Sequence, residues 1–341
     1  MNEFLVLTRA IHFGAVLWLF GEFVFFAVVV GPALRSLSED ASTDSRDPER
    51  RLVCVAGCCV AIGIASAIVW LLLEAASMSG TPLAVAFNRQ TLDVVVRETL
   101  FGRIWLVRLG LSLLLSAALW FAWRQQPRRK GAILKIGGTL LAGTYAATIA
   151  WTGHAAADAG ADHYLHLGSD AVHLLAAGAW VGALPGLISL LKHAGDVARR
   201  ERFALAVSAT RRFSTLGMVS VSALVVTGLV NTWYLVGSVP ALLGTEYGRL
   251  LLWKLLFFAT MLALAAINRL RLTPQLATAI PTTMGTPYRN TRARLRRNTV
   301  LEMAAGVAVV GIVAALGLAI PAGHMLDREH PPSMTSEGHV H

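Results

Sequence analysis

Histidine and aspartate side chains gather in one short stretch of the chain, WTGHAAADAGADHYLHLGSDAVH, residues 151–173. The stretch holds four histidines and three aspartates and has neither lysine nor arginine, although the whole chain carries a net charge of +10. His166, Asp170 and His173 are spaced i, i+4 and i+7, which places them on one stripe of a helix. Imidazole beside carboxylate suits a transition metal, copper or zinc above all, and Asp170 can instead orient a ligating imidazole. The stretch therefore predicts a metal site; the alternative is a solvated loop with an interfacial histidine.

The last eighteen residues, HMLDREHPPSMTSEGHVH, form a second group of potential metal ligands. They contain four histidines and two methionines. Short histidine-rich tracts are typical of metal capture, and thioether sulfur favours Cu(I) over zinc. We therefore take His324 and Met325 as candidate ligands and expect residues 325–341 to form a disordered tail. A plain solvated tail is the alternative.

The composition indicates that these groups belong to a membrane protein. Hydrophobic residues make up 55% of the chain and charged residues only 15%, against about a quarter in an average globular protein. Runs long enough to cross the hydrocarbon core, about 20 residues each, recur eight times and are continuous, which favours helices. The first run has no basic n-region or cleavage site of a signal peptide and is read as a retained helix. The runs are about 4–31, 52–78, 103–123, 133–152, 165–191, 213–236, 249–268 and 299–320.

Lysine and arginine residues are distributed unevenly among the loops that connect the apolar runs, and this bias predicts how the chain is oriented in the membrane. Four connections, 32–51, 124–132, 192–212 and 269–298, hold four, four, six and seven Lys/Arg residues. The two termini and the other connections together hold four. Because the Lys/Arg-rich loops of membrane proteins face the cytoplasm, both termini and the stretch 151–173 are expected on the periplasmic side. The same distribution argues against nucleic acid as a partner.

The chain also matches itself at a distance of about half its length. The opening of the third run, TLFGRIWLVRL, aligns without a gap with that of the seventh, TEYGRLLLWKL. The first and fifth runs share AIHFGAVLWLFG and AVHLLAAGAWVG, and the fourth and eighth end in WTGH and PAGH. Two parallel four-helix repeats are therefore predicted, residues 1–155 and 156–324, followed by the tail. Chance similarity between helices rich in Leu, Ala and Gly is the alternative.

The repeat pairs four histidines on one face of the membrane. His12 pairs with His173 near the start of each half, and His154 pairs with His324 at the end of each half. Ionisable residues inside a helix bundle are costly and are usually functional, so His12 and His173 are the stronger candidates. His166 has no mate in the first half.

Other polar residues lie inside the apolar runs. Arg108 and Lys254 occupy matching positions in the third and seventh runs, and snorkelling to the headgroups is the alternative role for both. With Glu74 and Asn231 they form a predicted polar pathway. Glu74 can also pair with Arg108.

Three cysteines cluster near the start of the second run. Cys54 and Cys58 are spaced i, i+4 and are a candidate thiolate exit site on the cytoplasmic side, although free cysteines usually act as small buried hydrophobes. The chain has no Walker loop, no Cys-x-x-Cys-His haem attachment site, no G-x-S-x-G and no H-E-x-x-H. We therefore expect no enzymatic activity.

Three segments carry a resemblance to a known family. HLLAAGAWVGALPGL, RFSTLGMVSVSALVVTGLVNTW and TEYGRLLLWKLLFFATMLALAAINR, all between residues 173 and 269, resemble the CopD/PcoD family of copper-resistance membrane proteins. Ala183 departs from the pattern, which has a second glycine after WVG. The resemblance implies a bacterial inner-membrane protein that handles periplasmic copper together with a soluble carrier of the CopC type, and it marks His154 and His173.

The sequence thus predicts a copper homeostasis protein that binds periplasmic copper, as Cu(I) or Cu(II), and imports it. One alternative is a b-type haem electron-transfer protein, because paired histidines on neighbouring helices can ligate iron. The other is a copper-binding scaffold that does not transport. The predicted ligands are His12, His154, His166, Asp170, His173, His324 and Met325.

Overall fold

The apolar runs form long helices in the computed structural model. It describes residues 1–36, 46–80, 88–124, 133–152, 163–194, 200–236, 239–278 and 286–319. Every regular element in these ranges is helical, which confirms the all-α class. The first half contains α1 (Asn2–Val24), η1 (Phe25–Val30), α2 (Gly31–Arg35), α3 (Arg46–Ser79), α5 (Arg89–Glu98), α6 (Leu100–Arg124), η3 (Ile133–Gly138), α8 (Thr139–Ala147) and η4 (Thr148–Thr152). The second half contains α9 (His163–Val181), α10 (Leu184–His193), α11 (Arg200–Val236), α12 (Val239–Gly244), α13 (Glu246–Ile267), η6 (Asn268–Leu272), α14 (Thr273–Thr278) and α15 (Thr286–Leu316).

Seven helical stretches in the described ranges are long and apolar enough to cross a membrane. They correspond to seven of the eight predicted runs, and they are Asn2–Arg35, Pro48–Ser79, Leu100–Arg124, His163–His193, Phe203–Tyr234, Glu246–Thr278 and Tyr288–Leu316. The remaining run, 133–152, consists of a π-helical segment, a nine-residue α-helix and a 3-10 segment in succession, and none of these is long enough by itself. Its central part, α8, packs against α1, α6 and α9.

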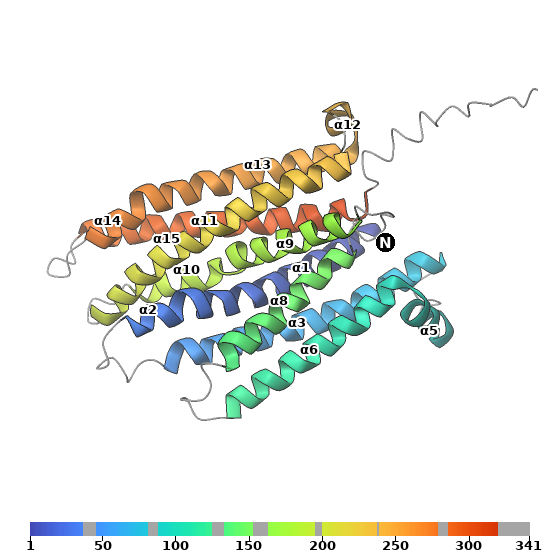
Figure 1. The fold of residues 1–341 in the computed structure, drawn as a ribbon, viewed down its shortest axis with the longest axis horizontal. Coiled ribbons are helices and arrows are strands. Elements are labelled where there is room, and N and C mark those ends of the chain that lie inside the picture. Colours follow the sequence, from blue (N-terminus) through green and yellow to red (C-terminus); the bar gives the residue numbers. More distant parts are fainter. Residues whose placement is uncertain are drawn as a thin grey trace, which may run out of the picture.

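The helices form two groups that meet along α1 and α9 (Figure 1). In one group α1 packs on α3, and α3 packs on α6. In the other group α9 packs on α11, and α13 packs on α15. The N-terminus and the short helices α5 and α12 lie at one end of the bundle (Figure 1). The basic connections leave from the opposite end, where α2 and α14 lie.

Two glycines set the crossing of α1 and α9. A Cβ built on Gly21 would lie 2.1 Å from the backbone carbon of Gly182, and one built on Gly182 would lie 2.0 Å from the carbonyl oxygen of Leu17. These distances are far below van der Waals contact. Glycine at both positions therefore lets the two backbones touch, and this contact joins the two groups of helices.

The Thr-x-x-Gly motif that opens α6 and α13 has a common structural role. The Thr99 hydroxyl accepts a hydrogen bond from the Gly102 amide at 2.9 Å, and the Thr245 hydroxyl accepts one from the Gly248 amide at 3.0 Å. Each threonine therefore caps its helix. A Cβ at either glycine would lie within 2.2 Å of a carbonyl oxygen of the preceding short helix. In each motif the threonine thus caps the long helix, and the glycine lets the preceding short helix, α5 or α12, pack closely against it.

Candidate functional site

A cavity of about 420 Å³ lies among the helices of the second half, between α9, α11, α13 and α15. We call it the His173 cavity. The wall nearest the first half is supplied by α1 and by η4. Most of the lining is apolar, and its polar and charged side chains are Arg9, Thr152, Asp170, His173, Asn231, Thr232, Tyr247 and Lys254. Such an arrangement, a mainly apolar pocket with a few convergent polar groups, is typical of a ligand site.

The hydrogen bonds of His173 determine which ring nitrogen is free. Its Nδ1 lies 2.9 Å from the hydroxyl oxygen of Thr227. That hydroxyl donates its only proton to the carbonyl oxygen of Ala223 at 2.6 Å. Thr227 must therefore accept from His173, so Nδ1 carries the ring proton and Nε2 keeps its lone pair. A neutral imidazole fixed in this way is the form that ligates metals.

Asp170 lies one turn before His173 on α9. Its carboxylate accepts a hydrogen bond from the side-chain amide of Asn231 at 3.2 Å and interacts electrostatically with Lys254. The other side-chain atom of Asn231, Oδ1, is buried and has no hydrogen-bond partner in the described part of the chain. The cavity therefore combines one carboxylate, one imidazole and one unsatisfied carbonyl oxygen, all of them possible ligands of a cation.

His166, the third member of the predicted stripe, is buried with 1% of its surface exposed. Its ring stacks on that of Tyr234 in α11, with the ring centres 4.8 Å apart and the planes at 13°. It is not among the residues that line the His173 cavity. The structure thus brings Asp170 and His173 to one cavity and places His166 against an aromatic ring.

His12 has a hydrogen-bond arrangement similar to that of His173 but a different setting. Its Nδ1 lies 3.0 Å from the hydroxyl of Ser66 and 3.2 Å from the carbonyl oxygen of Gly63. Ser66 donates to Ile62 at 2.7 Å, so His12 Nδ1 carries the proton. The Nε2 atom of His12 is buried without a hydrogen-bond partner in the described residues.

Aromatic rings and two cations surround His12, which has no exposed surface. The ring centres of Trp70, Tyr145 and Phe13 lie 5.5, 6.0 and 6.4 Å from that of the imidazole. The guanidinium groups of Arg9 and Arg108 lie 5.3 and 5.4 Å from the centre of the Trp70 ring. Arg108 also interacts electrostatically with the imidazole of His12, and a positive charge there opposes the binding of a metal cation.

The remaining predicted residues lie at several places. Arg108 is buried and donates to the hydroxyl and carbonyl oxygens of Thr148 at 3.0 and 2.7 Å, whereas Glu74 accepts from the indole of Trp70 at 3.1 Å. The predicted pair of Glu74 with Arg108 is therefore not formed. Cys54 and Cys58 are both exposed on α3.

Three predicted ligands, His154, His324 and Met325, lie outside the described residues. Among the residues that are described, no three His, Cys, Asp or Glu side chains come together as a ready metal site. Of the predicted ligands that are described, Asp170 and His173 line the His173 cavity.

Two polar residues that contact His173 or line a cavity are missing from the sequence prediction. Thr227 fixes the proton of His173, and it could have been found because Ser66–His12 and Thr227–His173 have the same separation of 54 residues. Glu302 lines a second cavity and is buried with 2% exposure. The sequence feature that could have identified Glu302 is that it is the one acidic residue within the apolar run 299–320.

Comparison with known proteins identifies the family. Residues 1–165 match the profile described as Copper resistance protein D-like, N-terminal domain, and residues 207–316 match that of Copper resistance protein D. The chain is 31% identical over 261 residues to Copper resistance protein D of Pseudomonas syringae pv. tomato, which covers 76% of this chain and 81% of that protein. The chain belongs to the copper resistance protein D family. The resemblance inferred from the sequence is thereby confirmed.

Two further relatives of the family are similar over shorter stretches. Copper transport protein CutJ of Bacillus subtilis is 32% identical over 198 residues, which are 55% of this chain and 35% of that protein. Inner membrane protein YebZ of Escherichia coli is 30% identical over 217 residues, 62% of this chain and 70% of that protein. No solved structure matches. With its seven candidate spans, this member of the copper resistance protein D family is a multi-pass inner-membrane protein, as predicted.

Proposed function

We propose that this protein captures periplasmic copper at the His173 cavity and imports it to the cytoplasm. The observation that supports the proposal is the tautomer of His173, a residue that lines the cavity: its Nδ1 donates to Thr227, which leaves the lone pair of the ring on Nε2. Membership of the copper resistance protein D family supplies the identity of the metal. Copper is the transported substrate in this proposal, and no covalent chemistry is catalysed.

The ligand set combines His173 with residues near it. Asp170 supplies a carboxylate from the preceding turn of α9, and Thr152 lines the same cavity. His154 follows Thr152 by two residues in the sequence and is the second imidazole that we propose. Imidazole nitrogen binds both oxidation states of copper, and the histidines and methionines of the tail supply the metal to this site. A periplasmic carrier of the CopC type delivers copper to the tail.

We further propose that the chain is built from two parallel four-helix repeats with both termini in the periplasm. A single offset of 161 residues relates His12 to His173, Ser66 to Thr227 and Gly21 to Gly182. In both halves the histidine and its hydroxyl partner are therefore 54 residues apart. The contact between Gly21 and Gly182, two equivalent positions, is what a two-fold axis through the α1–α9 crossing would produce.

The same offset supports placing copper in the second half. It relates Arg9 to Asp170 and Trp70 to Asn231. In the first half these positions form a cation–π contact of 5.3 Å, whereas in the second half they form an amide–carboxylate hydrogen bond of 3.2 Å. At these two related positions the first half therefore has a guanidinium and the second half a carboxylate, and Arg9 and Lys254 also line the His173 cavity. In this proposal His173 binds copper and His12 has a packing role.

The proposal is tested by copper uptake into liposomes that contain the purified protein and a copper indicator in the lumen. We expect His173→Ala to lower the initial rate at least tenfold. His193→Ala is the matched control, because His193 is exposed at the end of α10, where its ring contacts the carbonyl oxygen of Ser189, and it does not line the His173 cavity. Equal rates for the wild type and His173→Ala contradict the proposal.

The same preparation separates the two alternatives. A scaffold binds copper at the membrane and accumulates none in the lumen. A b-type haem protein shows a Soret absorption band and binds no stoichiometric copper.

A further inference from the structure

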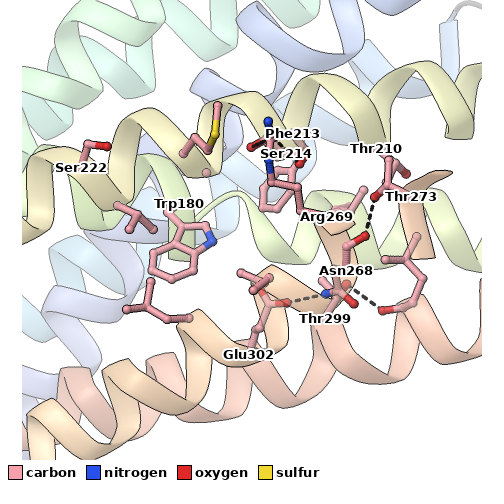
Figure 2. A pocket seen from close by; sticks show the side chains of 18 residues that line it. Trp180, Thr210, Phe213, Ser214, Ser222, Asn268, Arg269, Thr273, Thr299 and Glu302 are labelled. Atoms are coloured by element: carbon pink, nitrogen blue, oxygen red, sulfur yellow. Dashed lines mark hydrogen bonds between the residues drawn. The ribbon is translucent and has the colours of Figure 1, made fainter. Parts of the chain in front are cut away.

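A second cavity of about 250 Å³ lies in the second half, and Asn268, Arg269 and Thr273, just after the end of α13, line it (Figure 2). We call it the Glu302 cavity. Its walls come from α9, α10, α11, α13, η6, α14 and α15. Its polar and charged lining residues are Thr210, Ser214, Ser222, Asn268, Arg269, Thr273, Thr299 and Glu302. None of the predicted copper ligands within the described residues lines it.

Glu302 is held at this cavity by a directed chain of amides. The side-chain amide of Asn298 donates to Asn268 Oδ1 at 3.0 Å, and the Asn268 amide in turn donates to a carboxyl oxygen of Glu302. Figure 2 shows Asn268 and Glu302 facing each other, joined by this bond. Because Asn298 is itself only 6% exposed, the arrangement is fixed by packing.

Arg269 is the one other charged residue among those that line the cavity. Its guanidinium donates to the hydroxyl and carbonyl oxygens of Ser214 at 2.8 and 3.1 Å. It forms no salt bridge with Glu302 in the described residues, which leaves the carboxyl bonded to an amide. α9, α10, α11 and α14 contribute no titratable side chain to the lining.

The chemistry of the lining selects the ligand. Apart from the thioether of Met218, the possible ligand atoms of the lining are hydroxyl, carbonyl, amide and carboxyl groups. A soft cuprous ion prefers several sulfur or imidazole ligands, and this lining has one sulfur and no imidazole. Hard divalent cations take six or more oxygen ligands, usually with several carboxylates, whereas this cavity has one carboxylate. The guanidinium of Arg269 in the same lining would also repel a metal cation. A proton requires only the one carboxyl. Isolated acids inside membrane bundles commonly serve as proton relays.

Trp180 connects the Glu302 cavity with the His173 cavity, because it lines both. Its indole is 1% exposed and packs edge-on against Phe258, with ring centres 6.2 Å apart. On the other side it faces Gly217, where an added Cβ would lie 3.8 Å from the indole nitrogen. Among the lining residues, Trp180 is the one that the two cavities share.

We propose that Glu302 is a proton-binding site that accepts a proton from the aqueous phase and returns it there, and that Trp180 is the partition between this site and the His173 cavity. The coupling of this proton to copper movement rests on the function proposed above. The proposal that Glu302 binds a proton does not rest on that function. Proton binding and coupling to copper are therefore tested separately.

Proton binding is tested by infrared difference spectra of the purified protein between acidic and alkaline pH. We expect a carboxyl C=O band that titrates in the wild type and disappears in Glu302→Gln. Asn268→Leu keeps the carboxyl and removes its amide donor, so the band persists at a shifted frequency. Glu22→Gln, which removes a buried carboxyl paired with Arg51 in the first half, keeps the Glu302 band. A spectrum that is unchanged in Glu302→Gln overturns the proposal.

Coupling is tested in liposomes with a copper indicator and a pH-sensitive dye in the lumen. We expect copper movement to produce a proton signal in the wild type and none in Glu302→Gln. A copper-dependent proton signal that persists in Glu302→Gln overturns the coupling. If the wild type moves no copper, the proposed transport function is wrong, and the infrared titration alone decides the role of Glu302.

Discussion

The Nδ1 atom of His173 lies 2.9 Å from the hydroxyl oxygen of Thr227, 54 residues further along the chain. The same separation joins His12 to Ser66 at 3.0 Å. In each pair the hydroxyl donates to a carbonyl of its own helix and accepts from the imidazole. The two pairs share their geometry, so the difference between their surroundings decides which histidine can bind a metal cation.

Replacing the hydroxyl acceptor of His173 is expected to weaken copper binding. Thr227→Val removes the oxygen that receives the Nδ1 proton, and the loss of such an outer partner lowers metal affinity about 10–100-fold. Thr227→Ser is the matched control, because it keeps a hydroxyl at a position where the first half has Ser66. The measurement is a competition titration with a copper chelator. Equal losses in both variants would mean that the hydroxyl has no part in binding.

Two of the three charged side chains of the His173 cavity, Asp170 and Lys254, are expected to act in opposite directions on copper affinity. Asp170→Asn removes the negative charge that attracts the metal, and Lys254→Met removes a positive charge that repels it. We expect affinity to fall about tenfold in the first variant and to rise by a similar factor in the second, a change of about 1.4 kcal/mol each. Titrations at low and high salt measure both. Shifts of the same sign in the two variants contradict this electrostatic account.

The contact between α1 and α9 predicts a strong position dependence of glycine substitution. Gly182→Ala places a methyl group 2.0 Å from the carbonyl oxygen of Leu17, so the helices must separate, at a cost of about 1–3 kcal/mol. Gly14 lies on α1, and a Cβ added there would meet no atom within 4 Å, so Gly14→Ala is the control. Because alanine favours helix over glycine, this control is neutral or stabilising.

Thermal unfolding in detergent measures both glycine variants. The expected result is a lower midpoint for Gly182→Ala than for the wild type and an unchanged or higher midpoint for Gly14→Ala. Identical midpoints for the two variants would show that the crossing tolerates a side chain.

Much of the fold was predictable, because long apolar runs in a membrane leave the backbone only the helix. The run 133–152 shows the limit of this reasoning. Its hydropathy resembles that of the other runs, but three kinds of helical turn follow one another within it. Hydropathy reports that a segment is apolar and does not report which backbone hydrogen bonds it forms.

The candidate site was predictable in part, for a related reason. Spacing placed Asp170 and His173 on one stripe, and the structure has both at one cavity. Spacing also grouped them with His166, which instead stacks on Tyr234. The position of a residue on a helix determines the direction in which its side chain points. Which residues that side chain contacts depends on the neighbouring helix, which spacing in the sequence does not reveal. For the same reason the sequence could not show that His12 is enclosed by aromatic rings whereas His173 lines a cavity.

The central claim is that His173, and not His12, provides the copper-binding nitrogen. The most direct test is the copper affinity of purified His173→Ala and His12→Ala, measured side by side with the wild type by chelator competition. We expect His173→Ala to lower the copper affinity at least a hundredfold. His12→Ala is expected to stay within about threefold of the wild-type affinity, a change in binding free energy of about 0.7 kcal/mol. A large loss in His12→Ala together with wild-type affinity in His173→Ala would contradict this claim.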